Sequence, residues 1–201
     1  WDFDPKRRAT ATWTFDNNNL YLCFRDVSDA TPMSNHGRVV NQLFKTGDAV
    51  AFELRTKPDD DTPTVIEGDL RLLVTVFEGE PIAILYRYKV EGTEKPVEFA
   101  SPVTTTKIDV VKVLDAARVA IDRRASAYDV RISVPLAELG FKPEPGKTYL
   151  CDVGVIHSDS QGQINELRMY WSNHATGIVS DLAIEATIDP RRWGSFEVLK
   201  K

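Results

Sequence analysis

The sequence predicts an all-β fold, an antiparallel β-sandwich of jelly-roll type with very little helix. Short segments alternate apolar and polar residues with a period of two, and turn residues separate them. Roughly nine to twelve such strands are typical of a sandwich or jelly roll. The chain has 201 residues, 42% of them hydrophobic, which is enough for one core. Neither an internal repeat nor a linker-like stretch divides it, so we expect a single domain over residues 1–201.

The N-terminal quarter predicts a β-hairpin followed by a long excursion. Residues 10–15 and 20–25 alternate, and Asp16-Asn17-Asn18-Asn19 between them is a turn sequence. Residues 26–46 are polar and irregular, and a loop of this length in a compact domain is often functional. A strand over 49–56 follows, and residues 57–68 are expected to form a second loop.

The middle of the chain predicts a second hairpin and several short strands. Residues 70–77 and 81–88 are strands joined across Glu78-Gly79-Glu80, and 97–103 is a further short strand. Residues 108–117 fit either a helical turn or a strand. We favour strand or irregular structure there, because residues 118–123 alternate directly behind them.

The C-terminal part continues the alternation. Residues 128–134 form a strand, and residues 136–139 read as one helical turn that Gly140 stops. Further strands are expected at 149–157, 166–171 and 195–199, with a polar loop at 158–163 and a long loop at 172–185.

Charge and motifs exclude several function classes. The net charge of −5 argues against a nucleic-acid partner, which usually meets a basic face. No apolar run approaches the roughly 20 residues of a membrane span. The chain opens with Trp1 rather than Met, so we expect a mature product or a piece excised from a larger protein, whose other domains would be its neighbours.

The two cysteines each fall within a predicted strand. Cys23 and Cys151 are expected to be buried thiols that pack as small apolar residues. A disulfide between them is the alternative, if their strands are neighbours. Their separation excludes a Cys-x-x-Cys metal or redox motif.

Signatures of catalysis are absent, so we predict a noncatalytic module. There is no Gly-x-Ser-x-Gly elbow, Walker loop or His-Glu-x-x-His motif. His36, His157 and His174 lie in unrelated segments and are expected to be ordinary histidines. A glycosidase needs two carboxylates facing each other across a sugar. The acidic residues that would supply such a pair are Glu53, Asp152, Asp159, Glu166 and Glu185.

The tryptophans suggest a sugar as ligand. Flat aromatic rings stack on the apolar faces of sugars, and polar neighbours bind the hydroxyls. Trp171 stands at the entry to a long loop and is the candidate for stacking. Trp13 and Trp193 are expected to fill the core, and Trp1 lies at the end of the chain.

Two aspartates flank the first long loop and are candidate ligands for a structural calcium ion. Calcium takes six to eight oxygen ligands from carboxylates and loop carbonyls. Asp29 and Asp48 have suitable positions. Ordinary turn and capping roles are the alternative for both.

Several segments together resemble a known family. They are Asn19-Leu20-Tyr21-Leu22 with Asp29, Gly47-Asp48-Ala49-Val50, Gly68-Asp69-Leu70-Arg71, residues 128–139, Tyr170-Trp171-Ser172-Asn173 and residues 190–194. In this order they resemble family 9 carbohydrate-binding modules and their DOMON-like relatives over nearly the whole chain. The resemblance implies a jelly-roll-like sandwich, an extracellular, periplasmic or cell-surface location, and often bound calcium.

The resemblance also implies a sugar site. In sugar-binding members two tryptophans clamp a terminal sugar, helped by a Glu, an Arg, a Gln and an Asn. Arg71 matches the Arg, and Gln163 and Asn173 are counterparts of the amides. This chain has Phe44-Lys45-Thr46 at the place of the first tryptophan, the family's Glu falls near Ala51, and residues 172–181 contain no second tryptophan.

These observations leave three hypotheses. The first is a noncatalytic module that binds a polysaccharide or oligosaccharide through Arg71, Gln163, Trp171 and Asn173. The second is an interaction or architectural domain that has lost the sugar site. The third is a haem-carrying domain of the DOMON type, with axial ligands from among Met33, His36, Met169 and His174.

Overall fold

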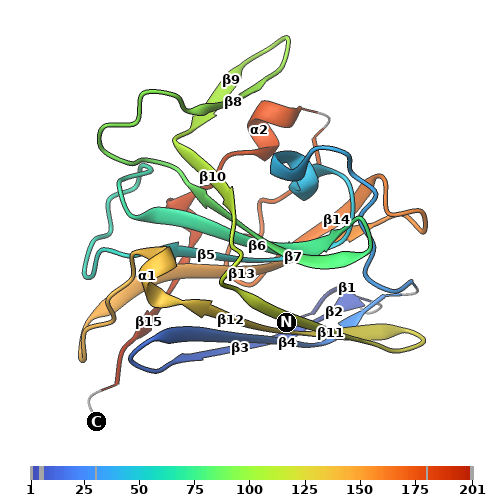
Figure 1. Cartoon of the computed structure of the whole chain (residues 1–201), viewed down its shortest axis with the longest axis horizontal. Coiled ribbons are helices and arrows are strands. Elements are labelled where there is room, and N and C mark those ends of the chain that lie inside the picture. The colour runs from blue at the N-terminus through green and yellow to red at the C-terminus, as the bar shows by residue number, and fades with distance from the viewer. Residues whose placement is uncertain (1, 5–6, 30, 180, 200–201) are drawn as a thin grey trace.

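Two antiparallel sheets packed face to face make up the body of the computed structural model (Figure 1), which describes residues 2–4, 7–29, 31–179 and 181–199. The seven-stranded sheet has the order β10-β7-β6-β5-β13-β14, with β15 also paired to β13. The four-stranded sheet has the order β11-β12-β4-β3. The predicted all-β sandwich is therefore confirmed.

The strands of the two large sheets come from all parts of the chain. The seven-stranded sheet contains β5 (Ala49–Arg55), β6 (Asp69–Phe77), β7 (Glu80–Arg87), β10 (Val110–Val113), β13 (Thr148–Ser158), β14 (Asn165–Tyr170) and β15 (Gly194–Glu197). The four-stranded sheet contains β3 (Thr10–Phe15), β4 (Asn19–Ser28), β11 (Arg118–Arg123) and β12 (Ala127–Pro135). Two small hairpins are formed by β1 (Asp2–Asp4) with β2 (Arg7–Arg8), and by β8 (Val97–Ala100) with β9 (Thr105–Ile108).

The main core lies between the two sheets. Alternate residues of each strand point into it, because successive side chains of a strand face opposite sides. Leu20, Leu22 and Phe24 of β4 meet Phe52 and Leu72 of the larger sheet there. On β4 the residues between them are half-buried or exposed, so the four-stranded sheet shows the alternation expected when one face meets water.

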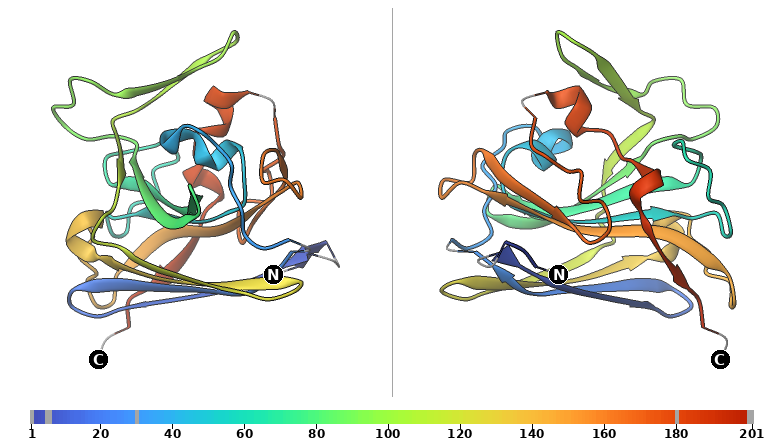
Figure 2. Two further views of the ribbon diagram at one scale, coloured as in Figure 1. Left: turned by 45° about the vertical axis from the view of Figure 1, so that its right-hand side comes forward. Right: turned by 180° about the vertical axis from the view of Figure 1, so that it is seen from behind.

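The larger sheet is buried on both faces. All seven residues of β5 are buried, and Ala49, Ala51, Leu73 and Tyr86 belong to a second apolar cluster on the outer face. Two short 3-10 helices, η1 (Val40–Lys45) and η2 (Pro190–Arg192), the helix α2 (Leu182–Glu185) and the β8–β9 hairpin cover this face (Figure 2).

Many local predictions are confirmed. The strands over 10–15 and 118–123 have the expected bounds, and the first hairpin turns at Asp16–Asn19. The ambiguous stretch after residue 108 forms the strand β10. The helical turn is α1 (Leu136–Leu139), and Gly140 ends it with a left-handed φ of 62°, which glycine adopts without steric cost.

Two expected loops contain helices, and this corrects the sequence reading. The excursion over 26–46 includes η1, and the loop over 172–185 ends in α2. Both helices are held by burial against the outer sheet face, since Leu43 and Phe44 of η1 are fully buried. Such long-range packing leaves no local pattern in so short a segment. The strands β1, β2 and β9 were not predicted, and β8 ends at Ala100, earlier than expected.

The cysteines are not bridged. Cys23 lies half-buried on β4 and Cys151 is fully buried on β13, in different sheets, and both are free thiols. Burial raises the pKa of the Cys151 thiol to about 12, so it behaves as an apolar core residue. Within the described residues, no helix has the length and hydropathy needed to cross a bilayer. Trp1 lies outside the described residues.

Candidate functional site

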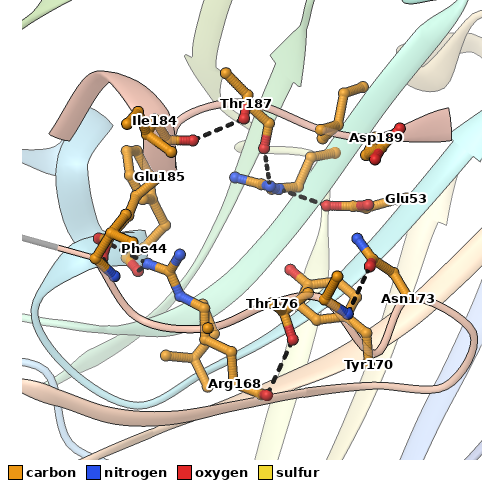
Figure 3. A pocket seen from close by; sticks show the side chains of 16 residues that line it. Phe44, Glu53, Arg168, Tyr170, Asn173, Thr176, Ile184, Glu185, Thr187 and Asp189 are labelled. Atoms are coloured by element: carbon orange, nitrogen blue, oxygen red, sulfur yellow. Dashed lines mark hydrogen bonds and ion pairs between the residues drawn. The ribbon is translucent and has the colours of Figure 1, made fainter. Parts of the chain in front are cut away.

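A pocket opens on the outer face of the seven-stranded sheet, where the C-terminal segment crosses it (Figure 3). Its floor is formed by β5, β6, β13 and β14, and residues 173–189 supply much of its wall. The cavity volume is about 210 Å³. We call it the Arg71 pocket, after the cation at its floor.

A row of charged residues crosses three neighbouring strands at this floor. Asp152 of β13 stands opposite Glu53 of β5, and Glu53 stands opposite Arg71 of β6. Arg71 donates from Nε to Glu53 Oε1 at 2.9 Å, and from Nη2 to the carbonyl of Thr187 at 2.9 Å. Trp193 donates from Nε1 to Glu53 Oε2 at 2.7 Å. Both oxygens of Glu53 are thus bound, and Arg71 also ties the C-terminal segment to the sheet.

The Arg71 guanidinium keeps its charge although it is only 6% exposed. Burial acts to lower the pKa of Arg71, but the neighbouring Tyr88, Tyr170 and Glu53 outweigh it, and the pKa is raised. The guanidinium also lies over the ring of Phe44, with 5.9 Å between its carbon and the ring centroid. A cation over an aromatic face is attracted by the ring quadrupole.

A second group of charges lies beside the first. Arg168 of β14 and Lys45 of η1 both donate to Oε2 of Glu185, each at 2.9 Å. Arg168 also donates to the carbonyl of Phe44 at 3.0 Å. Burial lowers the pKa of Arg168, and the nearby charge of Arg71 lowers it further. The two guanidinium groups are therefore close enough to repel each other within one cavity.

Asp152 holds the loop that carries Asn173 into the pocket. Its Oδ1 accepts from the backbone N–H of Ser172 at 2.9 Å, and its Oδ2 accepts from that of Asn173 at 2.8 Å. Burial raises the pKa of Asp152 to about 7. The side-chain oxygen of Asn173 accepts from the backbone N–H of Ala175 at 3.0 Å, so the Asn173 side chain is fixed in the pocket wall.

The structure brings together two of the four predicted ligand-binding residues. Arg71 and Asn173 line the same pocket. Gln163 is exposed in the loop before β14, where its backbone N–H binds Asp159, and it does not line the pocket. Trp171 does not line it either.

Trp171 faces the opposite side of the sheet from the pocket, because it follows Tyr170 by one residue and strand side chains alternate. Its ring meets Trp13 edge-on, with 6.4 Å between centroids, and lies against Gly194. It remains 39% exposed. Trp13 is partly buried against the core between the sheets, as expected. Trp193 is buried as expected, but in the second apolar cluster on the outer face rather than between the sheets.

Glu53 is the pocket residue whose pairing the sequence did not lead us to expect. We considered it only as a catalytic carboxylate, and the family resemblance placed the glutamate near Ala51. Ala51 and Glu53 face the same side of β5, two residues apart, and it is Glu53 that pairs with Arg71. An acidic residue inside an otherwise apolar strand was the available signal, because buried carboxylates are almost always paired. Arg168 and Lys45 gave no such signal.

The carboxylates considered for catalysis do not form an open acid–base pair in the structure. Glu53 and Glu185 line the Arg71 pocket, and both are ion-paired with arginines. Asp159 is half-buried and Glu166 is exposed, and neither lines the pocket. Asp152 accepts from three backbone N–H groups, which describes an anchor for the loop rather than an acid facing a substrate.

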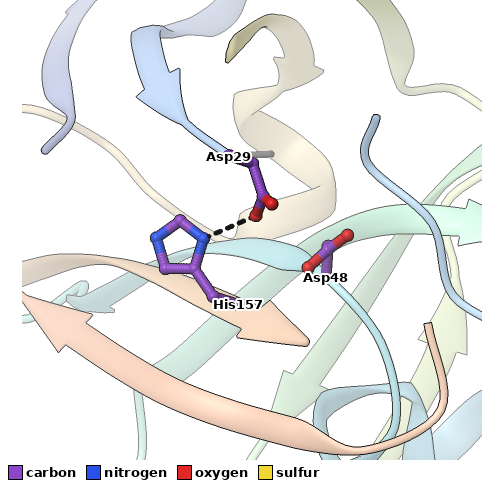
Figure 4. A group of neighbouring side chains, drawn as sticks. All are labelled: Asp29, Asp48 and His157. Atoms are coloured by element: carbon purple, nitrogen blue, oxygen red, sulfur yellow. Dashed lines mark hydrogen bonds and ion pairs between the residues drawn. The ribbon is translucent and has the colours of Figure 1, made fainter. Parts of the chain in front are cut away.

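The predicted calcium ligands do meet. Figure 4 shows Asp29, Asp48 and His157, whose potential ligand atoms all lie within 4.8 Å of one another. All three are buried. Burial raises the pKa of Asp48. At Asp29 burial acts in the same direction, but the hydrogen bond from His157 and the other contacts outweigh it and lower the pKa.

The donors around this acidic cluster differ from a calcium site. Asp48 accepts from the backbone N–H and the hydroxyl of Ser158 and from the backbone N–H of Ser34. Asp29 accepts from His157 at 2.8 Å, and Arg7 lies 3.2 Å from the same oxygen. Calcium takes six to eight oxygens, whereas the described side chains offer two satisfied carboxylates, an imidazole and a guanidinium. These side chains by themselves supply too few oxygens for calcium in this arrangement, and calcium at Asp29 and Asp48 stays an untested prediction.

The residues named for haem are dispersed. Met169 is buried in the core between the sheets. Met33 and His36 line a separate groove of about 740 Å³, where His36 Nδ1 lies 2.7 Å from the carbonyl of Gln161. His174 is near the carbonyl of Trp171. These four residues do not form a pair of facing axial ligands, and haem binding stays a prediction.

Comparison with known proteins identifies the fold. No protein-family model matches the chain, and no curated protein sequence does. Among solved structures, a carbohydrate-binding module of family 9 from Caldicellulosiruptor kristjanssonii in complex with glucose has a TM-score of 0.58 at 12% identity, covering 100% of this chain and 81% of that one. The same organism's family 9 module in complex with cellotriose has a TM-score of 0.52 at 13% identity, with 96% and 77% covered. The fold is therefore similar to that of family 9 modules, as the resemblance implied, and the DOMON-like part stays a prediction.

Proposed function

We propose that this chain is a noncatalytic carbohydrate-binding module that holds a single sugar ring in the Arg71 pocket. The observation that carries the proposal is the buried Arg71–Glu53 pair at the floor of an open cavity. A buried charged pair at a surface opening is expensive to maintain, and such groups mark functional sites more often than chance. The solved structures with this fold that hold glucose and cellotriose support a sugar as ligand.

The size of the pocket favours one sugar ring. Sites for drug-sized ligands enclose about 300–1,000 Å³, and the Arg71 pocket encloses about 210 Å³. A monosaccharide, or the last residue of a longer glycan, suits a cavity of this size. The side chains around it are rich in hydrogen-bonding groups, among them Asn173, Thr176 and Thr187, which suits a ligand covered with hydroxyls.

Hydrogen bonds, rather than stacking, are the proposed basis of recognition. Among the residues that the structure describes, no tryptophan lines the pocket, and Arg71 covers the ring of Phe44. Hydrogen bonds from a charged group are roughly twice as strong as neutral ones. Arg71 and Asn173 therefore replace, in this proposal, the aromatic contact that was expected from Trp171.

Isothermal titration with glucose and cellotriose tests the proposal. We expect wild type to bind at least one, and Arg71→Lys, which keeps the charge but loses the planar fork, to bind about tenfold more weakly or worse. Asn173→Ala is a second pocket variant, and Gln163→Ala, at an exposed loop position, is the matched control and should bind as wild type does. A blank titration for wild type across a panel of glycans would contradict the proposal.

An interaction or architectural domain is the second candidate. The observation that favours it is the bond from Arg71 to Thr187, since the same guanidinium fastens the C-terminal segment over the sheet. In that case Arg71→Lys changes stability, and no glycan binds to wild type. Titration of wild type with glycans therefore distinguishes the two candidate functions.

We further propose that the module works outside the cytoplasm, in a secreted, periplasmic or surface-attached protein with other domains. The fold shared with family 9 modules supports this. Fractionation of cells that express the full-length parent protein is the test. Recovery of the protein only in the cytoplasm would count against the proposal.

A further inference from the structure

The charges at the Arg71 pocket do not balance. Three cations, Arg71, Arg168 and Lys45, share two carboxylates, Glu53 and Glu185. A single oxygen of Glu185 accepts from both Arg168 and Lys45. One positive charge in this group is therefore without a carboxylate of its own.

The neighbouring acids do not remove this excess. Asp189 also lines the pocket, but its oxygens accept from Arg191 and Arg192 at 2.7–3.2 Å. That group again holds two cations for one carboxylate. Asp152 stands behind Glu53 and can add at most one negative charge, and its raised pKa of about 7 keeps much of it protonated near neutrality.

Both arginines also have donors that no described protein group uses. Nε of Arg168 is buried and has no hydrogen-bond partner. Arg71 bonds through Nε and Nη2, and a guanidinium has five N–H donors in a planar fork. The two groups line the same cavity, and each makes the other's charge more costly. Nε of Arg168 is closed off from the cavity, but an anion in the cavity would accept from the remaining Nη groups of the two guanidiniums and relieve their repulsion.

We propose that the Arg71 pocket selects a sugar that carries a carboxylate, that is, a uronic acid or a glycan that ends in one. This inference rests on the proposed function, since it names the class of sugar that the same pocket takes. The arginine fork matches the two oxygens of a carboxylate. A phosphate brings a charge of about −1.5 to −2 at neutral pH, more than the single excess charge, and it would lie close to Glu53 and Glu185. A carboxylate therefore suits the pocket better than a phosphate.

Three probes with the same ring test the inference by isothermal titration: glucuronic acid, its methyl ester and glucose. We expect glucuronate to bind at least about tenfold more tightly than the ester or glucose, because only glucuronate is charged. The preference should shrink as salt is raised from low to high ionic strength. Equal affinity for glucuronate and its ester would overturn the inference.

Two variants locate the effect. Arg168→Met removes the excess charge, while Lys45 stays to pair with Glu185, so the preference for glucuronate over its ester should fall to about twofold or less. Arg118→Ala is the matched control: this arginine is exposed on β11 of the four-stranded sheet and does not line the pocket, and the preference should stay unchanged. If Arg168→Met keeps the full preference, or Arg118→Ala removes it, the inference is wrong. Should Arg168→Met fail to fold, the salt dependence of wild type decides.

The outcomes separate this inference from the function on which it rests. If glucose binds as tightly as glucuronate, the preference for an acidic sugar is wrong and the sugar-binding function stands. If none of the three probes binds and a glycan panel is also blank, both are overturned. If glucuronate alone binds and Arg71→Lys abolishes it, both hold.

Discussion

The larger sheet carries two buried polar clusters that use their charges in different ways. In the Arg71 pocket three cations, Arg71, Arg168 and Lys45, share two carboxylates, and Nε of Arg168 has no partner among the described residues. In the acidic cluster of Asp29, Asp48 and His157, the carboxylates accept hydrogen bonds from the surrounding protein on both oxygens. The first cluster meets a cavity. In the second the carboxylates are satisfied within the protein, and the atom without a described partner is Nε2 of the His157 imidazole.

The difference indicates what separates a binding site from a structural anchor. Burying a charge costs several kcal/mol unless it is paired and hydrogen-bonded. When both oxygens of a carboxylate accept hydrogen bonds from the protein, as at Asp48, the carboxylate holds the surrounding chain segments in place. When donors are left over beside a cavity, the remaining interaction is available to a ligand. Both clusters are buried, so burial by itself does not distinguish the two roles.

The largest expected effect concerns the ion pair of the pocket. Arg71→Met should lower the free energy of unfolding by about 3–5 kcal/mol, because Glu53 is left buried without its cation. Urea denaturation measures it. The double variant Arg71→Met/Glu53→Gln should recover part of the loss, since no unpaired charge remains. A loss below about 1 kcal/mol for the single variant would show that the pair is not held tightly.

The pH dependence of stability tests the anchor behind the pocket. The pKa of Asp152 is raised by burial to about 7, so the folded protein binds this proton more tightly than the unfolded chain, whose carboxyl has a pKa near 4. The stability that the protonated Asp152 adds to the folded state is fully present at low pH. It is lost as pH rises from about 4 through 7, by at most about 1.4 kcal/mol per pH unit. Urea denaturation of wild type and Asp152→Asn over this range gives the difference. Parallel profiles would contradict the assignment.

A variant of the acidic cluster should affect stability alone. Asp48→Ala removes the acceptor for the backbone N–H groups of Ser158 and Ser34, and an unsatisfied buried donor costs about 1–3 kcal/mol. We expect a loss of about 2 kcal/mol in thermal or urea unfolding, with the affinity for sugar unchanged. A weakened affinity at unchanged stability would erase the distinction between the two clusters.

The smallest expected effect is that of calcium. Because the donors at Asp29 and Asp48 do not fit calcium, adding the ion or a chelator should shift the melting temperature by less than about 1 °C. A ligand that binds only the folded state stabilises it increasingly with concentration. A melting temperature that climbs steadily with calcium and falls with the chelator would support the calcium prediction. Arg7→Gln is the informative variant, because it removes the guanidinium beside Asp29.

The sequence determined the strands and their turns. Alternation over residues 10–15 and 118–123 corresponds to β3 and β11 with the same bounds, and Gly140 ends the only predicted helical turn at the expected place. These features are local, since they depend on the two-residue period of a strand and on the left-handed backbone that glycine accepts. The fold class and the resemblance to family 9 modules followed from the same patterns.

The tertiary structure alone decided which residues share the pocket. Arg71 and Asn173 were foreseen, but Glu53, Arg168 and Lys45 join them through cross-strand register and through the packing of η1 and of the C-terminal segment. Trp171 was assigned to the site and lies on the other side of the sheet, because one residue along a strand reverses the direction of the side chain. The alternation of a strand is set by neighbouring residues. Register and loop packing depend instead on contacts between residues that can be more than a hundred positions apart, as between Arg71 and Thr187.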